Sequence, residues 1–275
     1  VVADWLAERG AGRLVLVGRR GLTPEATARL PAWQAQGVQV VAEALDVADE
    51  AALGALLQRL RSDGGPPLRG VVHSAGVLAD AGLLQQDPTR YEKVFGPKVM
   101  GTCALERTTR ADALDFFVLF SSAASVLGSA GQGNHSAANA YLDQCAVARR
   151  QRGLPGLSIN WGPWSEVGAA MDRGAAERLA AQGVSALTPS QGLQALVRAM
   201  APVMPAQVVV LPAQWQRYAP RLGRGAVPDW LSEMARDDAD LEHNTPLPGA
   251  ELTSRAAPGA ADPARAAATA GRPSE

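Results

Sequence analysis

The chain has 275 residues, and 47% of them are hydrophobic, as expected for a globular protein. Its 26 lysines and arginines nearly balance 27 aspartates and glutamates, so its charge gives no reason to expect a nucleic-acid partner. Its two cysteines, Cys103 and Cys145, exclude a disulfide framework and a zinc site built from cysteines. No apolar run approaches the roughly 20 residues of a membrane helix. Charged residues also interrupt the first ten positions, where a signal peptide would be apolar. We therefore expect a cytoplasmic protein with no membrane partner.

Apolar runs of strand length alternate along the chain with helical patterns. Helices are predicted at residues 1–10, 23–37, 49–60, 88–110, 134–152 and 190–200. Strands are predicted at residues 13–18, 38–47, 70–76, 115–122, 156–162 and 207–212. Pro31 is expected to kink or break the second helix, because proline lacks the N–H of the helix ladder. Nearly all-apolar strands that alternate with helices predict an α/β fold, a doubly wound parallel sheet with helices on both faces.

The two ends of the chain depart from this pattern. The sequence opens directly in a helical pattern without an initiating methionine, so we expect a piece of a longer protein. From residue 235 onward it is rich in alanine, proline, glycine and charge, which predicts a disordered linker or tail. We therefore expect one folded domain over residues 1–234 and a tail over residues 235–275.

Residues that follow the strands are the first candidates for a site, because a doubly wound sheet binds ligands beyond the carboxyl ends of its strands. These residues are Arg19, Arg20, Asp46, Val47, Ser74, Ala75, Gly76, Ser121, Ser122, Gly162 and Pro163. Arg19 and Arg20 stand where the adenosine ribose of a dinucleotide would lie and could hold a 2′-phosphate, or they could form a solvated surface pair. Asp46 could bind an adenine amino group or only cap the next helix. Ala75 and Gly76 would let the backbone approach a ligand closely.

Six motifs occur in a fixed order: LDVAD, VVHSAGVLAD, PKVMGT, FSSAAS, the helix that contains Asn139, and NWGPW. Together they resemble the ketoreductase domain of modular type I polyketide synthases, a branch of the short-chain dehydrogenase/reductase family. The resemblance covers most of residues 1–230. It implies a Rossmann-like fold, NADPH as cofactor, and reduction of a carrier-bound β-ketoacyl thioester to a β-hydroxyacyl thioester. The implied partners are an acyl carrier domain and the other polyketide synthase domains.

The resemblance places the family's active site on four positions of this chain. Lys98 lies in PKVMGT, Ser122 in FSSAAS and Asn139 in the helix that follows. The family's tyrosine, which protonates the carbonyl oxygen, is replaced by His135. By resemblance, Ser122 hydrogen-bonds the carbonyl oxygen, while Lys98 and Asn139 orient the cofactor ribose and a water relay.

Whether His135 can do the work of a tyrosine decides between two functions. His135 and Asn139 are four residues apart on one predicted helix and so share a face. An unperturbed imidazole titrates near about 6.5, which makes it an adequate acid near neutrality. It is shorter than a phenol, however, and a misplacement of about 1 Å can cost about 10²-fold in rate. A working reductase and a redox-silent structural module, in which His135 only caps or packs the helix, both stay open.

A free-standing short-chain dehydrogenase is a third possibility. Such an enzyme normally has its lysine four residues after the tyrosine, and Asn139 occupies that position here. The open start and the long polar tail also disfavour it.

The family also places a strand and a glycine-rich turn before the helix that opens this sequence. Such a turn brings backbone N–H groups against the cofactor pyrophosphate, and neither element is present here. We therefore expect a sheet that lacks its first, central strand, weak binding of NADPH and marginal stability.

Two further features bear on the substrate. Family members of the B type carry Leu-Asp-Asp after the HxAG turn, and this chain has Leu78, Ala79 and Asp80 there. Leu127 stands where A-type members carry tryptophan, so the resemblance implies a B-type, D-configured 3-hydroxyl with Asp80 as the stereocontrol residue. Residues 161–187 resemble the substrate-side lid, with an ordinary surface helix as the alternative.

Overall fold

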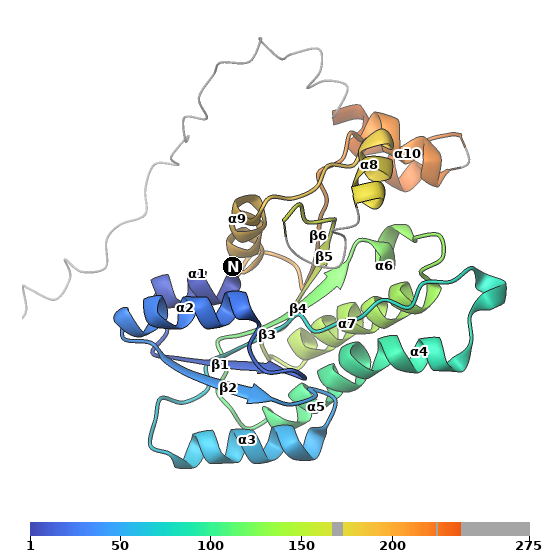
Figure 1. The fold of residues 1–275 in the computed structure, drawn as a ribbon. Helices are drawn as coiled ribbons and strands as arrows, with labels where there is room; N and C mark the ends of the chain where they lie inside the picture. The colour runs from blue at the N-terminus through green and yellow to red at the C-terminus, as the bar shows by residue number, and fades with distance from the viewer. Residues whose placement is uncertain (167–172, 224, 238–275) are drawn as a thin grey trace, which may run out of the picture.

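Six parallel strands form the centre of the computed structural model, which describes residues 1–166, 173–223 and 225–237 (Figure 1). The strands are β1 (Arg13–Gly18), β2 (Gln39–Ala44), β3 (Gly70–His73), β4 (Phe116–Ser122), β5 (Leu157–Trp161) and β6 (Gln207–Val210). The α-helices are α1 (Val2–Glu8), α2 (Pro24–Ala35), α3 (Glu50–Ser62), α4 (Pro88–Phe95), α5 (Gly101–Thr108), α6 (Ala124–Leu127), α7 (Gly133–Gln151), α8 (Arg173–Ala181), α9 (Pro189–Ala199) and α10 (Trp215–Leu222). The chain also forms the 3₁₀ turns η1 (Leu83–Gln85) and η3 (Asp229–Leu231) and the π-helical turn η2 (Gly96–Met100). This alternation confirms the predicted α/β fold.

The strands fall into two parallel sheets. β1 pairs with β2, and the second sheet runs in the order β3-β4-β5-β6. A doubly wound sheet has the strand order 3-2-1-4-5-6, so removal of its first strand leaves one pair and one longer sheet, as observed. Across the described part of the chain, β1 and β3 each keep one edge without a strand partner. The observed order therefore matches a doubly wound sheet without its first strand.

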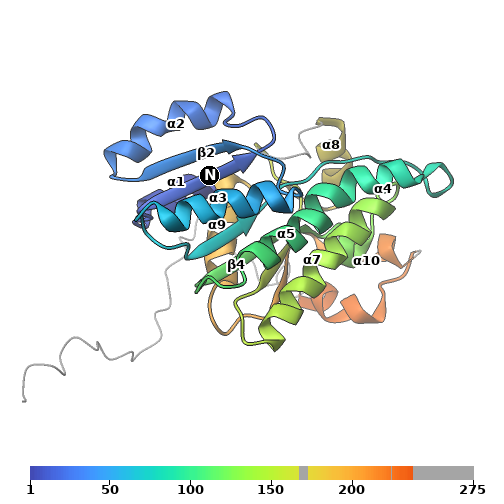
Figure 2. The same ribbon diagram turned by 90° about the horizontal axis from the view of Figure 1, so that it is seen from below.

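Helices cover both faces of the sheets, as predicted. Figure 1 shows α1 and α2 above β1 and β2, α3 below them, and α7 beside β4, while Figure 2 shows α3, α5 and α7 from below. Strand β4 illustrates why both faces are apolar. Val118 packs into the cluster that includes α9, whereas Phe117 and Leu119 pack against α7. Successive side chains of a strand point to opposite faces, so a strand covered on both sides needs apolar residues throughout.

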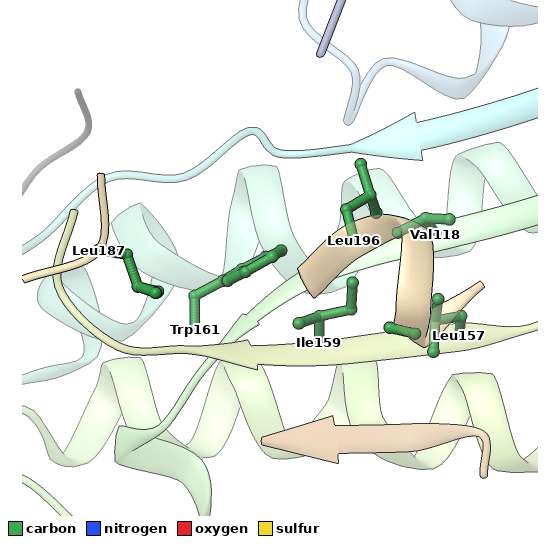
Figure 3. Packing of buried hydrophobic residues seen from close by; sticks show 7 residues of the cluster. Val118, Leu157, Ile159, Trp161, Leu187 and Leu196 are labelled. Atoms are coloured by element: carbon green, nitrogen blue, oxygen red, sulfur yellow. The ribbon is translucent and has the colours of Figure 1, made fainter. Parts of the chain in front are cut away.

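The largest apolar cluster holds the end of β5 in place. Figure 3 shows its residues Val118, Leu157, Ile159, Trp161, Leu187 and Leu196. The centre of the Trp161 ring also lies 5.3 Å from that of the tilted Phe120 ring. It lies 5.1 Å from that of Trp164, in the edge-on geometry that aromatic rings favour. The backbone that leaves β5 toward Gly162 and Pro163 therefore starts from a rigid point.

Gly192 in α9 makes this packing possible, and its replacement tests it. A Cβ at Gly192 would lie 2.1 Å from the Trp164 ring. We expect Gly192→Ala to lower the free energy of unfolding by about 1–3 kcal/mol through overpacking, measured by denaturant unfolding. Gly54→Ala in α3 is the matched control, because its Cβ would meet nothing closer than 3.7 Å. The control should raise stability through helix propensity, and equal effects from both variants would contradict the packing account.

Thr23 caps the start of α2, but the break predicted inside this helix is wrong. The Thr23 hydroxyl accepts a hydrogen bond from the Ala26 N–H at 3.3 Å, and Pro24 occupies the first turn of α2. Pro31 was expected to kink or break this helix, yet α2 continues to Ala35. Trp33 beyond it is buried against β1 and α1, and this packing outweighs the hydrogen bond that proline removes.

Parts of two predicted segments lie outside the described residues. They are residues 167–172 of the predicted lid and residues 238–275 of the predicted tail. Within the rest of the lid, α8 is helical, and residues 232–237 near the predicted domain boundary are also helical. No helix of the described chain has the length and apolarity needed to cross a membrane.

Candidate active site

Lys98 is the buried cation of the candidate site. It lies in η2, the π-helical turn between α4 and α5, and only 6% of its surface is exposed. Its Nζ donates a hydrogen bond to the carbonyl of Phe120 in β4, at 2.9 Å. Gly76 lies against it, since a Cβ there would be 3.1 Å from Cε of Lys98. The π-helical turn, an element frequent at functional sites, thus brings the lysine to the end of β4.

The end of β4 carries two serines with different roles. The Ser121 side chain is buried and donates to the carbonyl of Asn139 at 3.3 Å. Ser122 is half-buried, and its Oγ accepts from the Ala124 N–H at 3.2 Å. Because an amide N–H uses only one lone pair of this oxygen, the Ser122 hydroxyl hydrogen can still be donated to a ligand.

Helix α7 supplies His135 and Asn139, one turn apart as predicted. The Asn139 side chain is fully buried, and its Nδ2 donates to the carbonyl of His135 at 2.8 Å. Oδ1 of Asn139 and Nδ1 of His135 are buried and have no hydrogen-bond partner among the described residues. Buried polar atoms are nearly always satisfied, so two unsatisfied ones in one site indicate a place for a polar ligand.

The pKa values of His135 and Lys98 differ from the ordinary values of these side chains. Burial lowers the pKa of His135 to about 4, the Lys98 ammonium acts in the same direction, and the Asp80 carboxylate opposes it. Burial also lowers the pKa of Lys98 to about 8, which the Asp143 carboxylate opposes. The pKa of His135 thus lies below the unperturbed value of about 6.5 that would make it an adequate acid near neutrality. At pH 7 Lys98 is mostly charged, and only about one His135 in a thousand carries a second proton.

Asp80 lies in a segment held against the start of α7. The Gln132 side chain donates to the Asp80 carboxylate at 2.9 Å, and Arg90 donates to the Asp80 carbonyl at 3.1 Å. Asn134, which is fully buried, donates to the carbonyl of Ala79 at 2.9 Å. The Asn134 side chain also accepts from the His135 N–H at 2.7 Å. Sequence reasoning missed Asn134, although its position next to His135 was a signal.

The other predicted residues lie at the carboxyl ends of the strands. A pocket lined by residues 18–25 follows β1 and contains the exposed Arg19 and Arg20 beside the start of α2. Asp46 accepts from the Ala48 N–H at 3.0 Å, and Asp49, not Asp46, caps α3. The predicted capping alternative for Asp46 is therefore wrong. Exposed Ser74, Ala75 and Gly76 follow β3, Val47 follows β2, and Gly162 and Pro163 follow β5.

These features fit a nicotinamide dinucleotide at both of its ends. Two arginines next to a helix start suit a phosphate group on one side. A buried ammonium and the unsatisfied Oδ1 of Asn139 suit ribose hydroxyls on the other. Ser122 and His135 each offer a hydrogen-bonding group for a substrate oxygen.

A buried polar network next to the site was not predicted from the sequence. It joins Asp143 on α7 and Asn160 on β5 to the serines of β4 and α6. The signals were present in the sequence. Asp143 follows Asn139 by four residues, and Asn160 interrupts the apolar strand SINWG.

Comparison with known proteins identifies relatives of this arrangement. The family model described as the KR domain matches residues 1–166. Polyketide synthase GfsB of Streptomyces halstedii is 46% identical over 220 residues, which are 80% of this chain and 4% of that synthase. The spectinabilin polyketide synthase system protein NorB of Streptomyces orinoci is 39% identical over 247 residues, 87% of this chain and 11% of that protein. The chain spans a small part of these relatives.

Solved structures show the same similarity in three dimensions. One, described as an A-type ketoreductase from a modular polyketide synthase, has a TM-score of 0.80 and 38% identity, and the match covers 86% of this chain and 50% of that one. The first ketoreductase of the tylosin synthase has a TM-score of 0.76 and 39% identity, with 86% and 51% covered. The chain thus spans about half the length of these ketoreductases.

Proposed function

Because the chain belongs to the KR domain family of polyketide synthases, we propose that it reduces a β-ketoacyl thioester to a β-hydroxyacyl thioester with NADPH. The observation that supports the proposal is that Lys98, His135 and Asn139 gather at the end of β4, the strand whose last residue is Ser122. The substrate is held on an acyl carrier domain, and other polyketide synthase domains are the further partners. Residues 1–234 form the catalytic part of the chain.

The cofactor binds along the carboxyl ends of the strands. Arg19 holds the 2′-phosphate that distinguishes NADPH from NADH, with Arg20 beside it. Lys98 and Asn139 hold the nicotinamide ribose. The remaining contacts come from Asp46, Val47, Ser74, Ala75, Gly76, Gly162 and Pro163. When bound, NADPH supplies a hydride to the β-carbonyl carbon.

Side chains of Ser122, His135 and Lys98 act on the carbonyl oxygen of the substrate. Negative charge grows on this oxygen during reduction, and donors placed in advance stabilise it. The Ser122 hydroxyl donates to it, which its own bond from the Ala124 N–H permits. His135 then gives up a proton to form the product hydroxyl, while the Lys98 ammonium adds positive charge nearby.

The low pKa of His135, about 4, shapes the activity that we propose. The protonated imidazole is a strong acid, but few molecules carry it at pH 7. The reductase is therefore slow at neutral pH and faster in mild acid.

The product carries the B-type, D-configured hydroxyl in this proposal. Asp80 acts electrostatically on His135, and Gln132 and Asn134 hold its segment at the start of α7. Leu127 in α6 takes the position of the tryptophan of A-type members.

One observation favours a redox-silent module as the second candidate. Neutral His135 at pH 7 is a poor acid, and a domain retained only for its packing in a synthase would tolerate it.

The experiment that separates the two candidates follows absorbance at 340 nm with a β-ketoacyl thioester and either NADPH or NADH. We expect oxidation of NADPH in preference to NADH, and a D-configured product by chiral chromatography. An L-configured product would overturn the stereochemical assignment alone. Absence of cofactor oxidation at every pH between 5.5 and 8 would support the silent module.

A further inference from the structure

A buried carboxylate lies next to the candidate site and takes no part in the chemistry proposed above. Asp143 follows Asn139 by one turn of α7 and is 3% exposed. Its carboxylate accepts from the Ser158 hydroxyl at 2.6 Å and from the Ser125 hydroxyl at 2.7 Å. The Asn160 Nδ2 lies 3.0 and 2.9 Å from its two oxygens. One side chain thus joins α7 to both α6 and β5.

Asn160 extends this connection to β4. Its Nδ2 also lies 3.0 Å from the Ser121 hydroxyl and 3.3 Å from the carbonyl of Ser122. Its Oδ1 accepts from the Gln207 side chain of β6 at 3.1 Å. The orientation of Asn160 depends on Asp143, since only an acceptor can face its Nδ2 on that side. The position of Ser122 is therefore linked to Asp143 through one intermediate side chain.

The charge of Asp143 also needs a counterpart. A buried carboxylate without a nearby cation is costly, and Asp143 forms no ion pair in the described chain. Lys98 is the buried ammonium whose pKa Asp143 raises against the effect of burial. His73 and His135, which also face Lys98, have pKa values of about 4 and are neutral at pH 7. Lys98 and Asp143 both reach the end of β4, Lys98 at the carbonyl of Phe120 and Asp143 through Asn160 at the carbonyl of Ser122. The carboxylate therefore acts on the ammonium without forming an ion pair with it.

We propose that Asp143 is a positioning residue of the site, which fixes the Ser122 end of β4 through Asn160 and balances the ammonium of Lys98. As a statement about catalysis this rests on the proposed function, but its first test does not. If Asp143 only held the fold together, its hydrogen bonds would be enough and its negative charge would not matter. The test must therefore separate the effect of the Asp143 charge from the effect of its hydrogen bonds.

The chain is well suited to such a test, because Lys93 and Lys98 are its only lysines. Protein labelled with ¹³C-lysine should give two side-chain signals in NMR, with exposed Lys93 as the internal reference. In the wild type we expect the Lys98 signal to titrate with a midpoint near 8. In Asp143→Asn the midpoint should fall below the wild-type value, while Lys93 stays unchanged. An unchanged Lys98 midpoint in folded Asp143→Asn would overturn the proposal.

Two further variants separate charge from hydrogen bonding. Ser158→Ala removes one hydrogen bond to Asp143 and leaves its charge, so the Lys98 midpoint should stay near the wild-type value. If Asp143→Asn does not fold, Asp143→Asn combined with Lys98→Met removes both charges and should fold. Failure of that double variant to fold would contradict charge balance as the role of Asp143.

Activity provides the second readout. Where the wild type reduces a β-ketoacyl thioester, Asp143→Asn should lower kcat about tenfold or more with little change in KM, and Ser158→Ala should lower it less. Equal losses in the two variants would contradict the positioning role. Absence of wild-type turnover would count against the proposed function only, since the NMR titration needs no cofactor.

Discussion

Replacement of His135 with phenylalanine is expected to lower kcat about 10²-fold or more, because general acids contribute about 10²–10⁴-fold. Phenylalanine fills a similar volume and cannot donate a proton. The loss should appear in kcat rather than KM, since the proton is needed in the transition state. Cofactor oxidation with a β-ketoacyl thioester is the measurement.

His135→Tyr is the matched gain-of-function variant. A phenol is fully protonated at pH 7 and reaches further than an imidazole, whereas about one His135 in a thousand is protonated there. We expect kcat at pH 7 to rise at least tenfold above the wild type. If the His135→Phe variant has the same kcat as the wild type, His135 is not the acid. If tyrosine also gives no turnover, the silent module is favoured.

Addition of an apolar strand and a glycine-rich turn before Val1 is expected to tighten NADPH binding at least tenfold. The strand would pair with the edges of β1 and β3 that have no strand partner among the described residues, and so join the two sheets. The turn would contact the pyrophosphate. With about 1 kcal/mol for each added hydrogen bond, the free energy of unfolding should rise by roughly 3 kcal/mol or more. Fluorescence titration of NADPH and denaturant unfolding measure the two effects.

An extension of equal length built from glycine and serine is the control. It adds chain but cannot supply β-branched or apolar side chains to the sheet. Tight NADPH binding by the chain without any extension, or equal gains from both extensions, would contradict the role assigned to the missing strand.

The strands could be predicted because local signals specify them, and the apolar runs of β4 and β5 need no knowledge of their neighbours. The candidate residues Lys98, Ser122 and Asn139 came instead from the family resemblance, and their catalytic roles stay a prediction. Local rules predicted a kink or a break at Pro31. The break is wrong, since Trp33 packs against residues distant in the sequence.

Electrostatics of the site could not be read from the sequence. The pKa of His135 depends on burial and on Lys98, 37 positions away in the chain. The same holds for Asp143, since an aspartate on a helix is most often a solvated side chain. Only the folded arrangement shows that it faces Ser125, Ser158 and Asn160.

Acid conditions limit where activity can be measured. His73 and His135 have pKa values of about 4 in the folded state, below the unperturbed value of 6.5. Each group therefore contributes stability that is present above about pH 6.5 and is lost as the pH falls toward 4. Rates between pH 5.5 and 7.5 avoid most of this loss and also the deprotonation of Lys98 near 8.

The pH dependence of NADPH oxidation within this window tests most directly whether the imidazolium of His135 supplies the proton. Single-turnover rates with a saturating β-ketoacyl thioester are the measurement. We predict a fall of about tenfold for each pH unit from 5.5 to 7.5, because the protonated fraction of a group with a pKa of about 4 falls at that rate. A rate that stays level across this range, in protein shown to be folded, would contradict the account.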